Sequence, residues 1–199
     1  MSESVRKPQQ QRSIDKKKRI IEAGYALFAE KGYFSTNTVD IAKYAGVSTG
    51  IVYGYFRDKR DILLEVLQIY IDNVFSPFLE MFDKMKKPLD FRFLISHAVE
   101  ETVNIHRQNA AIHQTLHALT STDATINERF LTLEGEMTHK IADKLRILGY
   151  DREDLAERIH LALETIQSYA HECVYDKHSY INYGRMNEIV TDMLITLFE

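Results

Sequence analysis

The chain has 199 residues, of which 45% are hydrophobic and 27% are charged, and its formal net charge at pH 7 is −4. This composition is typical of a soluble globular protein, and eight glycines and three prolines are too few for a turn-rich all-β fold. The single cysteine, Cys173, excludes a disulfide framework and a cysteine-based zinc site within one chain, so we expect a reducing, cytoplasmic setting.

Residues 1–13 are polar and contain three consecutive glutamines, which predicts a disordered arm and not a secretory signal. A first helix is predicted over about 15–31, because apolar residues recur at helical spacing and Gly32 follows where a C-cap glycine belongs. Asn37 and Asp40 then have the spacing of a capping box, which predicts the start of a second helix.

Residues 38–56 predict two short helices around a tight turn. Gly46 supplies the positive φ that such a turn needs. Ala42 is a small residue where the two helices would cross, and Val52 is the apolar residue that would fix the second helix against the first. This order of residue types is typical of a helix-turn-helix.

The second of these helices carries the residues that we expect to meet DNA. Gly50 and Gly54 would allow the helix to approach the DNA backbone closely. The residues expected to reach phosphates or bases are Ser48 and Thr49 at the start of the helix, and Tyr53, Tyr55 and Lys59 at its end. The alternative is that the two tyrosines only cover the apolar seam.

Charge is divided unevenly along the chain. Residues 1–60 carry 12 Lys and Arg against 6 Asp and Glu, a net charge of +6, whereas residues 61–199 carry a net charge of −10. A basic segment on an acidic chain favours contact with a polyanion such as nucleic acid. The alternative is a solvated, lysine-rich helix.

The rest of the chain also has helical periodicity. Further helices are predicted over about 61–86, 89–107, 110–120, 124–148, 152–176 and 184–198. Segments of alternating polarity long enough for a strand are missing from the sequence, and so is an apolar run near the roughly 20 residues of a membrane span. We therefore predict an all-α fold, with a three-helix head and a larger helical body, and no membrane association.

Several separate elements of the head occur in an order that resembles one known family. They are the run from Ala23 to Tyr33, the T-V-D-I-A run, the A-G-V-S turn and the Y-x-Y-F-x-x-K run that ends at Lys59. Over roughly 15–67 the sequence is similar to the N-terminal domain of the tetracycline-repressor (TetR) family.

The resemblance implies an all-helical homodimer with a DNA-binding domain at 14–60 and an effector-binding and dimerisation domain at 61–199. Such a protein would be a sequence-specific transcriptional regulator, a repressor released from a pseudo-palindromic operator by a small effector. The resemblance also implies a phosphate contact for Thr38 and supports the contacts expected of the second helix. Gly54 departs from the larger residue common in the family.

The last two predicted helices carry apolar stripes that predict a dimer interface. The stripes are Leu155, Ile159, Ala162, Ile166, Ala170 and Cys173, and Met186, Ile189, Val190, Met193, Leu194 and Leu197. The alternative is that both stripes belong to the core. Catalytic motifs are missing from the sequence, so we predict neither an enzyme nor a cofactor. The alternative function is a small helical enzyme or carrier with an incidental helix-turn-helix.

Histidines in the body are candidates for ligand binding. His113 and His117 have the i, i+4 spacing of metal ligands, but a third ligand is not evident and we predict no metal site. We expect these two histidines, with Gln167 and His171, to line an effector cavity suited to a mostly apolar ligand. The alternative is a filled core with histidines at its rim.

Overall fold

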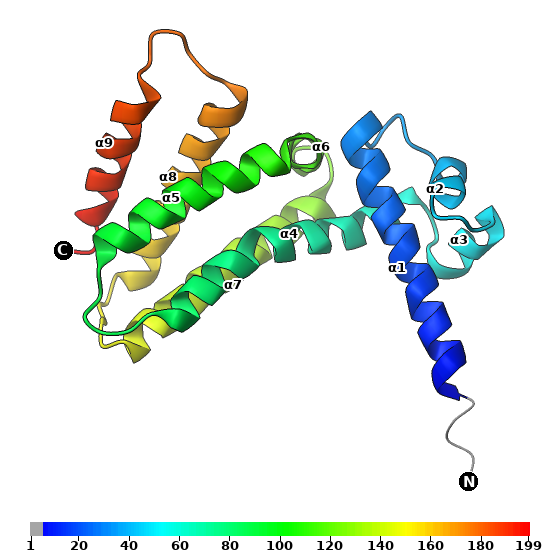
Figure 1. Ribbon diagram of the computed structural model, residues 1–199, viewed down its shortest axis with the longest axis horizontal. Coiled ribbons are helices and arrows are strands. Elements are labelled where there is room, and N and C mark those ends of the chain that lie inside the picture. The colour runs from blue at the N-terminus through cyan, green and yellow to red at the C-terminus, as the bar shows by residue number, and fades with distance from the viewer. Residues whose placement is uncertain (1–5) are drawn as a thin grey trace. The chain divides into compact units, whose positions relative to one another are not determined.

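The computed structural model describes residues 6–199, with the side chains of 6–9, 78 and 83 excepted, and every regular element in that range is an α-helix (Figure 1). The helices are α1 (Arg6–Lys31), α2 (Thr38–Tyr44), α3 (Thr49–Tyr55), α4 (Lys59–Lys84), α5 (Phe91–Gln108), α6 (Ala110–Thr120), α7 (Ala124–Ile147), α8 (Leu155–Tyr175) and α9 (Tyr183–Ile195). The predicted all-α fold is confirmed.

The chain divides into two compact units. The first, here called the head, contains the chain up to Ile71 together with Ala111–Ile126. The second, here called the body, contains Asp72–Ala110 and Asn127–Glu199. The head is therefore larger than the predicted domain at 14–60, because it includes the first half of α4 and the whole of α6 after its first residue.

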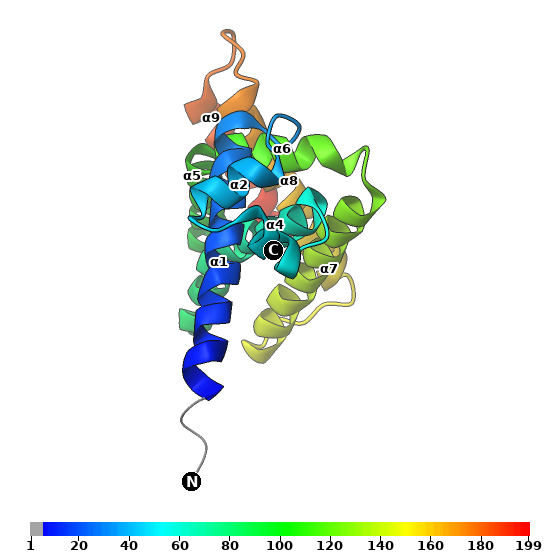
Figure 2. The same ribbon diagram turned by 90° about the vertical axis from the view of Figure 1, so that its right-hand side faces the viewer.

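Helix α1 begins earlier than the sequence suggested, and Figure 2 shows it as one long helix that runs past α2 toward the N-terminus. The prediction of a disordered arm over 1–13 is wrong for 6–13, which are helical, while 1–5 lie outside the described residues. Glutamine, arginine and lysine are good helix formers, and the Gln11 side chain donates to Asp15 one turn later at 2.9 Å. Local propensity and side-chain pairing thus extend the helix.

The head core forms where α1 crosses α4. Phe28 and Ile62 are fully buried. A Cβ added at Gly24 would lie 2.6 Å from the Ile62 Cγ2 atom, so only glycine allows the two helices to approach this closely. Helix α6 joins the same unit because the Tyr70 hydroxyl and His113 Nδ1 are 2.5 Å apart and both side chains are buried.

The body has its own apolar core, built by α5, α7, α8 and α9. The stripe predicted on α8 for a dimer interface lies entirely in this core: Leu155, Ile159, Ala162, Ile166, Ala170 and Cys173 are all buried. On α9, Val190 and Leu194 are buried as well, whereas Ile189 and Met193 are exposed. The α8 stripe is therefore intramolecular, because α5 already packs against that face.

Helix α4 contains the one segment among the described residues, Lys59–Phe82, that is long and apolar enough to cross a membrane by length and composition. The expectation that nothing in the chain approaches that length does not hold for this helix. Its side chains Ile62, Leu63 and Val66 are buried in the fold, and the buried core helix of a protein outside the membrane passes the same test.

Candidate nucleic-acid interface

Side-chain caps fix the ends of the two short helices in the head. The Asn37 side chain accepts a hydrogen bond from the Asp40 N–H at 2.9 Å, and Ser48 Oγ accepts one from the Ile51 N–H at 3.4 Å. Between the helices, Gly46 has a φ of 65°, a left-handed conformation that favours glycine. The predicted capping residue and turn glycine are confirmed, and together they set the angle between α2 and α3.

The faces of α2 and α3 that meet are apolar and buried. Ile41, Ala42, Val52 and Phe56 are at most 3% exposed. The predicted crossing residue and the predicted anchor of the second helix thus lie in the seam. Because this seam is filled, α3 is held rigidly with its opposite face outward.

The outward face of α3 carries Gly50, Tyr53 and Gly54 at helical spacing, and all three are exposed. A Cβ added at Gly54 would meet nothing within 4 Å among the described residues, and one at Gly50 would meet only the Ser48 Oγ atom at 4.0 Å. Neither glycine is needed for packing inside the chain. The small side chains leave room for something outside it.

Hydroxyl groups border this face. Thr38 Oγ1 and the Tyr53 hydroxyl are 3.0 Å apart, so the first residue of α2 is tied to the recognition helix α3. On the other side, the Tyr55 hydroxyl lies 2.9 Å from Ser13 Oγ of α1. In each pair one hydroxyl donates to the other, which leaves one O–H free to donate to a further acceptor.

The contact between Ser13 and Tyr55 joins residues 42 positions apart, and the sequence contained no signal for it. The prediction of an arm over 1–13 leaves Ser13 out of the interface. Thr49, the remaining predicted contact on α3, is partly exposed at the first position of the helix.

Lys59 lies in a different environment from the one predicted. Its ammonium group donates to the backbone carbonyls of Tyr33 at 2.6 Å and Thr36 at 2.7 Å, and it lies 4.2 Å from the centre of the Tyr33 ring. Burial lowers the pKa of this lysine. Lys59 therefore ties the start of α4 to the loop between α1 and α2, a structural role that sequence reasoning missed.

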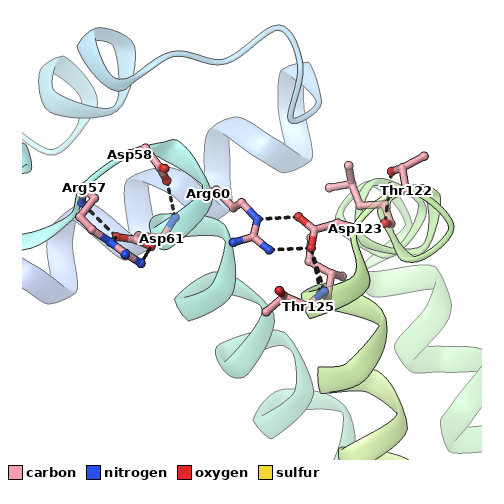
Figure 3. A network of polar contacts seen from close by, with 9 residues as sticks. Arg57, Asp58, Arg60, Asp61, Thr122, Asp123 and Thr125 are labelled. Carbon is pink, nitrogen blue, oxygen red and sulfur yellow. Dashed lines mark hydrogen bonds and ion pairs between the residues drawn. The ribbon is translucent and has the colours of Figure 1, made fainter.

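The first turn of α4 holds two ion pairs (Figure 3). The exposed Arg57 side chain binds Asp61 through two bonds of 2.8 Å, and this hydrogen bonding holds the pKa of the Asp61 carboxyl at about 2. Arg60 binds Asp123 through bonds of 2.6 and 2.7 Å, and hydrogen bonding to Arg60 likewise lowers the pKa of Asp123 to about 2.

Asp123 has a second role, because it also accepts from the backbone N–H groups of Thr125 and Ile126 at the start of α7. The carboxylate thus caps α7 while it pairs with the head residue Arg60. Contacts between residues 63 positions apart leave no local sequence signal.

The four residues predicted to line an effector cavity are divided between the two units. His113 and His117 belong to the head, with ring centres 4.1 Å apart, and Gln167 and His171 belong to the body. The apolar pocket of the body, about 70 Å³, has none of the four in its lining. This pocket is lined by side chains such as Phe82, Phe91, Leu145, Ala162 and Phe198. His113 Nδ1 contacts the Tyr70 hydroxyl, and an effector cavity lined by the four predicted residues stays a prediction.

Comparison with known proteins places residues 20–66 in a family model described as "Bacterial regulatory proteins, tetR family". The chain is 42% identical over 74 residues to the uncharacterized HTH-type transcriptional regulator YuxN of Bacillus subtilis (strain 168), covering 37% of this chain and 25% of that protein. It is 30% identical over 111 residues to the HTH-type transcriptional regulator AcrR of Shigella flexneri, covering 54% and 51%. The chain thus spans between a quarter and about half of the length of these two relatives.

Solved structures extend the likeness in fold to both units. A transcriptional regulator of the TetR/AcrR family from Thermobifida fusca YX-ER1 matches with a TM-score of 0.65 and 20% identity, covering 93% of this chain and 99% of that one. Salmonella enterica GusR matches with a TM-score of 0.69 and 18% identity, covering 92% and 95%. Residues 20–66 of the head thus match the TetR family of bacterial regulatory proteins in sequence, and the fold across both units is shared with solved structures of that family.

Proposed function

We propose that this protein is a sequence-specific, DNA-binding transcriptional regulator whose helix α3 enters the major groove. The observation that carries the proposal is the outward face of α3, where two glycines with open space around them are bordered by hydroxyl groups of known position. A helix with such a face can approach DNA closely while the hydroxyls at its borders meet phosphates.

Four of the predicted contacts acquire a role in this arrangement. The Thr38–Tyr53 pair has one hydroxyl hydrogen left to donate to a phosphate oxygen. Ser48 uses its oxygen as an acceptor for the Ile51 N–H, which leaves its own O–H free to donate to DNA. The Lys59 ammonium donates two of its three N–H groups to backbone carbonyls, which leaves one for DNA. We therefore assign Lys59 a minor share of the DNA-binding affinity.

The test is binding to a duplex recovered by selection from random DNA, followed by fluorescence anisotropy over a series of KCl concentrations. We expect the logarithm of the affinity to fall linearly with the logarithm of salt concentration, with a slope of about −0.9 for each phosphate contacted. If selection recovers no common sequence and the affinity for DNA does not change with salt, the proposal of a DNA-binding regulator is contradicted.

We also propose that the protein is a homodimer on a pseudo-palindromic operator. With the α8 stripe buried, the surface available for a partner is formed by the exposed apolar side chains Leu161 of α8 and Ile189 and Met193 of α9. A groove of about 340 Å³ lies between these helices, lined by residues such as Thr165, Ser168 and Met186.

The dimer is tested by replacing Ile189, which is 67% exposed, with aspartate and measuring the molecular mass by light scattering. The wild-type chain should have twice the 23.2 kDa of the monomer, and Ile189→Asp should shift the mass toward that of the monomer. The matched control is Ile147→Asp, because Ile147 is 77% exposed on α7 and should not change the mass. If Ile189→Asp stays dimeric like the control, the dimer interface does not include Ile189.

The third part of the proposal is that a small apolar effector releases the protein from DNA. Its site is the apolar pocket of the body, where Phe82, Phe91 and Phe198 contribute rings and a polar anchor is missing from the described lining. Because the pocket is only about 70 Å³, ligand entry requires it to widen. Linkage then requires DNA to weaken effector binding by the same factor as the effector weakens DNA binding.

Two test ligands, toluene and benzoate, distinguish an apolar effector site from a charged one. Toluene should release DNA from the protein in the anisotropy assay and benzoate should not, because an apolar pocket gives a carboxylate no partner. Ala98→Leu fills the pocket and should abolish the response to toluene. A response to benzoate alone would contradict the proposed site.

A further inference from the structure

Helix α1 packs against α2 and reaches beyond the helix-turn-helix, and two of its side chains lie beside α3 and the turn before it. Ser13 Oγ lies 2.9 Å from the Tyr55 hydroxyl at the end of α3. Further along α1, the Arg19 guanidinium lies beside the turn before α3, since a Cβ added at Gly46 would be 4.0 Å from its Nη1 atom. Figure 1 shows α1 continuing past α3 toward the N-terminus. The recognition helix therefore has a flank of α1 directly beside it.

Three cations lie on that flank. Arg12, Lys16 and Arg19 follow one another at intervals of four and three residues, which brings their side chains to one face of the helix. Arg12 and Arg19 are exposed and Lys16 is partly exposed. We call these three residues the α1 cationic flank.

The cations of the flank differ from their neighbours in how they are paired. Lys17 forms an ion pair with Glu65 at 2.6 Å, and Lys18 forms one with Glu22 at 3.6 Å. Among the side chains that the structure describes, by contrast, those of the α1 cationic flank form neither an ion pair nor a side-chain hydrogen bond. The side of α1 next to the recognition helix thus keeps its positive charge uncompensated.

We propose that the α1 cationic flank binds the sugar-phosphate backbone of the same DNA duplex that α3 enters, and so extends the protein's contact beyond the major groove. The inference rests on the proposed function, because it needs α3 to be seated on DNA. Its occupant follows from charge complementarity and from continuity with α3 through the contact between Ser13 and Tyr55.

The dimensions of the flank suit a DNA strand. From Arg12 to Arg19 the helix rises by about 10 Å, at 1.5 Å per residue. One strand of B-DNA carries about three phosphates over that length, at 3.4 Å along the axis for each. The Ser13–Tyr55 pair has one hydroxyl hydrogen left for a phosphate at the border between flank and α3. Cations and hydroxyl together form a continuous track for the backbone.

The test compares three proteins on the selected duplex over a series of KCl concentrations: wild type, Arg12→Ala/Lys16→Ala and Lys18→Ala. The slope of log affinity against log salt is negative. In the double variant it should become less negative by about 2 for each head bound, because two phosphate contacts are lost. Lys18→Ala also removes one positive charge from α1, but on another face, and should keep the wild-type slope.

Two further results complete the test. Arg12→Lys/Lys16→Arg keeps both charges and should retain the wild-type slope, while thermal melting should show all variants folded, because the replaced side chains are at the surface. A double variant with the same slope as Lys18→Ala overturns the inference and leaves the proposed function standing. A wild-type protein without salt-dependent binding overturns the proposed function itself.

Discussion

The head and the body expose different kinds of surface. In the head, exposed polar groups are held in place by specific contacts, such as the pair of Thr38 with Tyr53 and the cap that Ser48 provides. In the body, the apolar stripe on α8 is buried in the core, and the pocket beside it is small and apolar. The head thus presents a preorganised surface to a partner, whereas the apolar pocket of the body must widen to admit a ligand.

Four glycines of the head fall into two groups. Gly24 is required by the approach of α1 to α4, and Gly46 by the backbone of the turn. Gly50 and Gly54 satisfy no requirement inside the chain, since an added Cβ would find open space. Their role has to be sought outside the molecule, at the exposed surface of α3.

The largest expected effect concerns the independence of the two cores. Phe28 is fully buried in the head and packs edge-on against Tyr33, so Phe28→Ala should destabilise the head by about 3–5 kcal/mol. Amide hydrogen exchange should then quicken in the head while α8 and α9 stay protected. Phe93→Ala is the control, because Phe93 is 60% exposed in the body. Equal loss of protection in both units would break the comparison.

Next in size is the loss of the lysine that joins α4 to the loop after α1. Lys59→Ala leaves the carbonyls of Tyr33 and Thr36 without this donor and should lower the free energy of unfolding by about 1–3 kcal/mol. Urea denaturation measures the change, with Lys43→Ala as control, since Lys43 is exposed on α2. If Lys59→Ala weakened DNA binding with no loss of stability, the lysine would be a DNA contact after all.

A smaller, pH-dependent effect is expected from the pair of Arg60 with Asp123. Because the folded-state pKa of Asp123 is about 2, below the ordinary value of 3.8, its contribution is complete above pH 3.8 and is lost as the pH falls through 2. Asp123→Asn should lower the free energy of unfolding by about 0.5–1 kcal/mol at neutral pH, since this pair is partly exposed to solvent.

Denaturation at several pH values checks this account of Asp123. The difference between wild type and Asp123→Asn should disappear as the pH falls below about 2, and the control Asp143→Asn should show little difference at any pH, since Asp143 pairs only on the surface. A difference that persisted in acid would show that the cap of α7, and not the charge, stabilises this junction.

The smallest expected effect sharpens the description of the α3 border. Tyr53→Phe removes only the hydroxyl that is shared with Thr38, so stability should change by less than about 0.5 kcal/mol. DNA affinity should fall by roughly twofold to tenfold, as for one hydrogen bond of about 0.5–1.5 kcal/mol. Tyr44→Phe is the matched control, because Tyr44 is 60% exposed on α2. Equal affinities would remove Tyr53 from the interface.

Much of the head could be predicted from sequence because its determinants are local. Asn37 and Asp40 are three residues apart, and Gly46 needs only its own φ to end the turn. The contacts that escaped prediction join distant residues: Ser13 with Tyr55, and Arg60 with Asp123. Periodicity locates a helix and its apolar face, but it does not tell which neighbour will cover that face.

The body was harder for the same reason. Periodicity predicts its helices, but it leaves open whether a partner subunit or the core covers the α8 stripe, and α5 covers it. Chemical type alone suggests the histidines and the glutamine of α6 and α8 as effector ligands, but it does not reveal that His113 contacts Tyr70. Which polar side chains face a cavity depends on the packing of several helices at once, and one sequence does not contain that information in readable form.

The central claim is that the glycine surface of α3 exists for close approach to DNA, and one substitution tests it most directly. Gly50→Leu adds a side chain where a Cβ meets only Ser48 Oγ at 4.0 Å, so the protein should unfold at the same urea concentration as wild type or higher, because glycine is a poor helix former. The same variant should bind the selected duplex at least roughly tenfold more weakly, a loss of about 1.4 kcal/mol. Unchanged affinity together with unchanged stability would contradict the claim, since α3 would then tolerate bulk on the very face proposed to meet DNA.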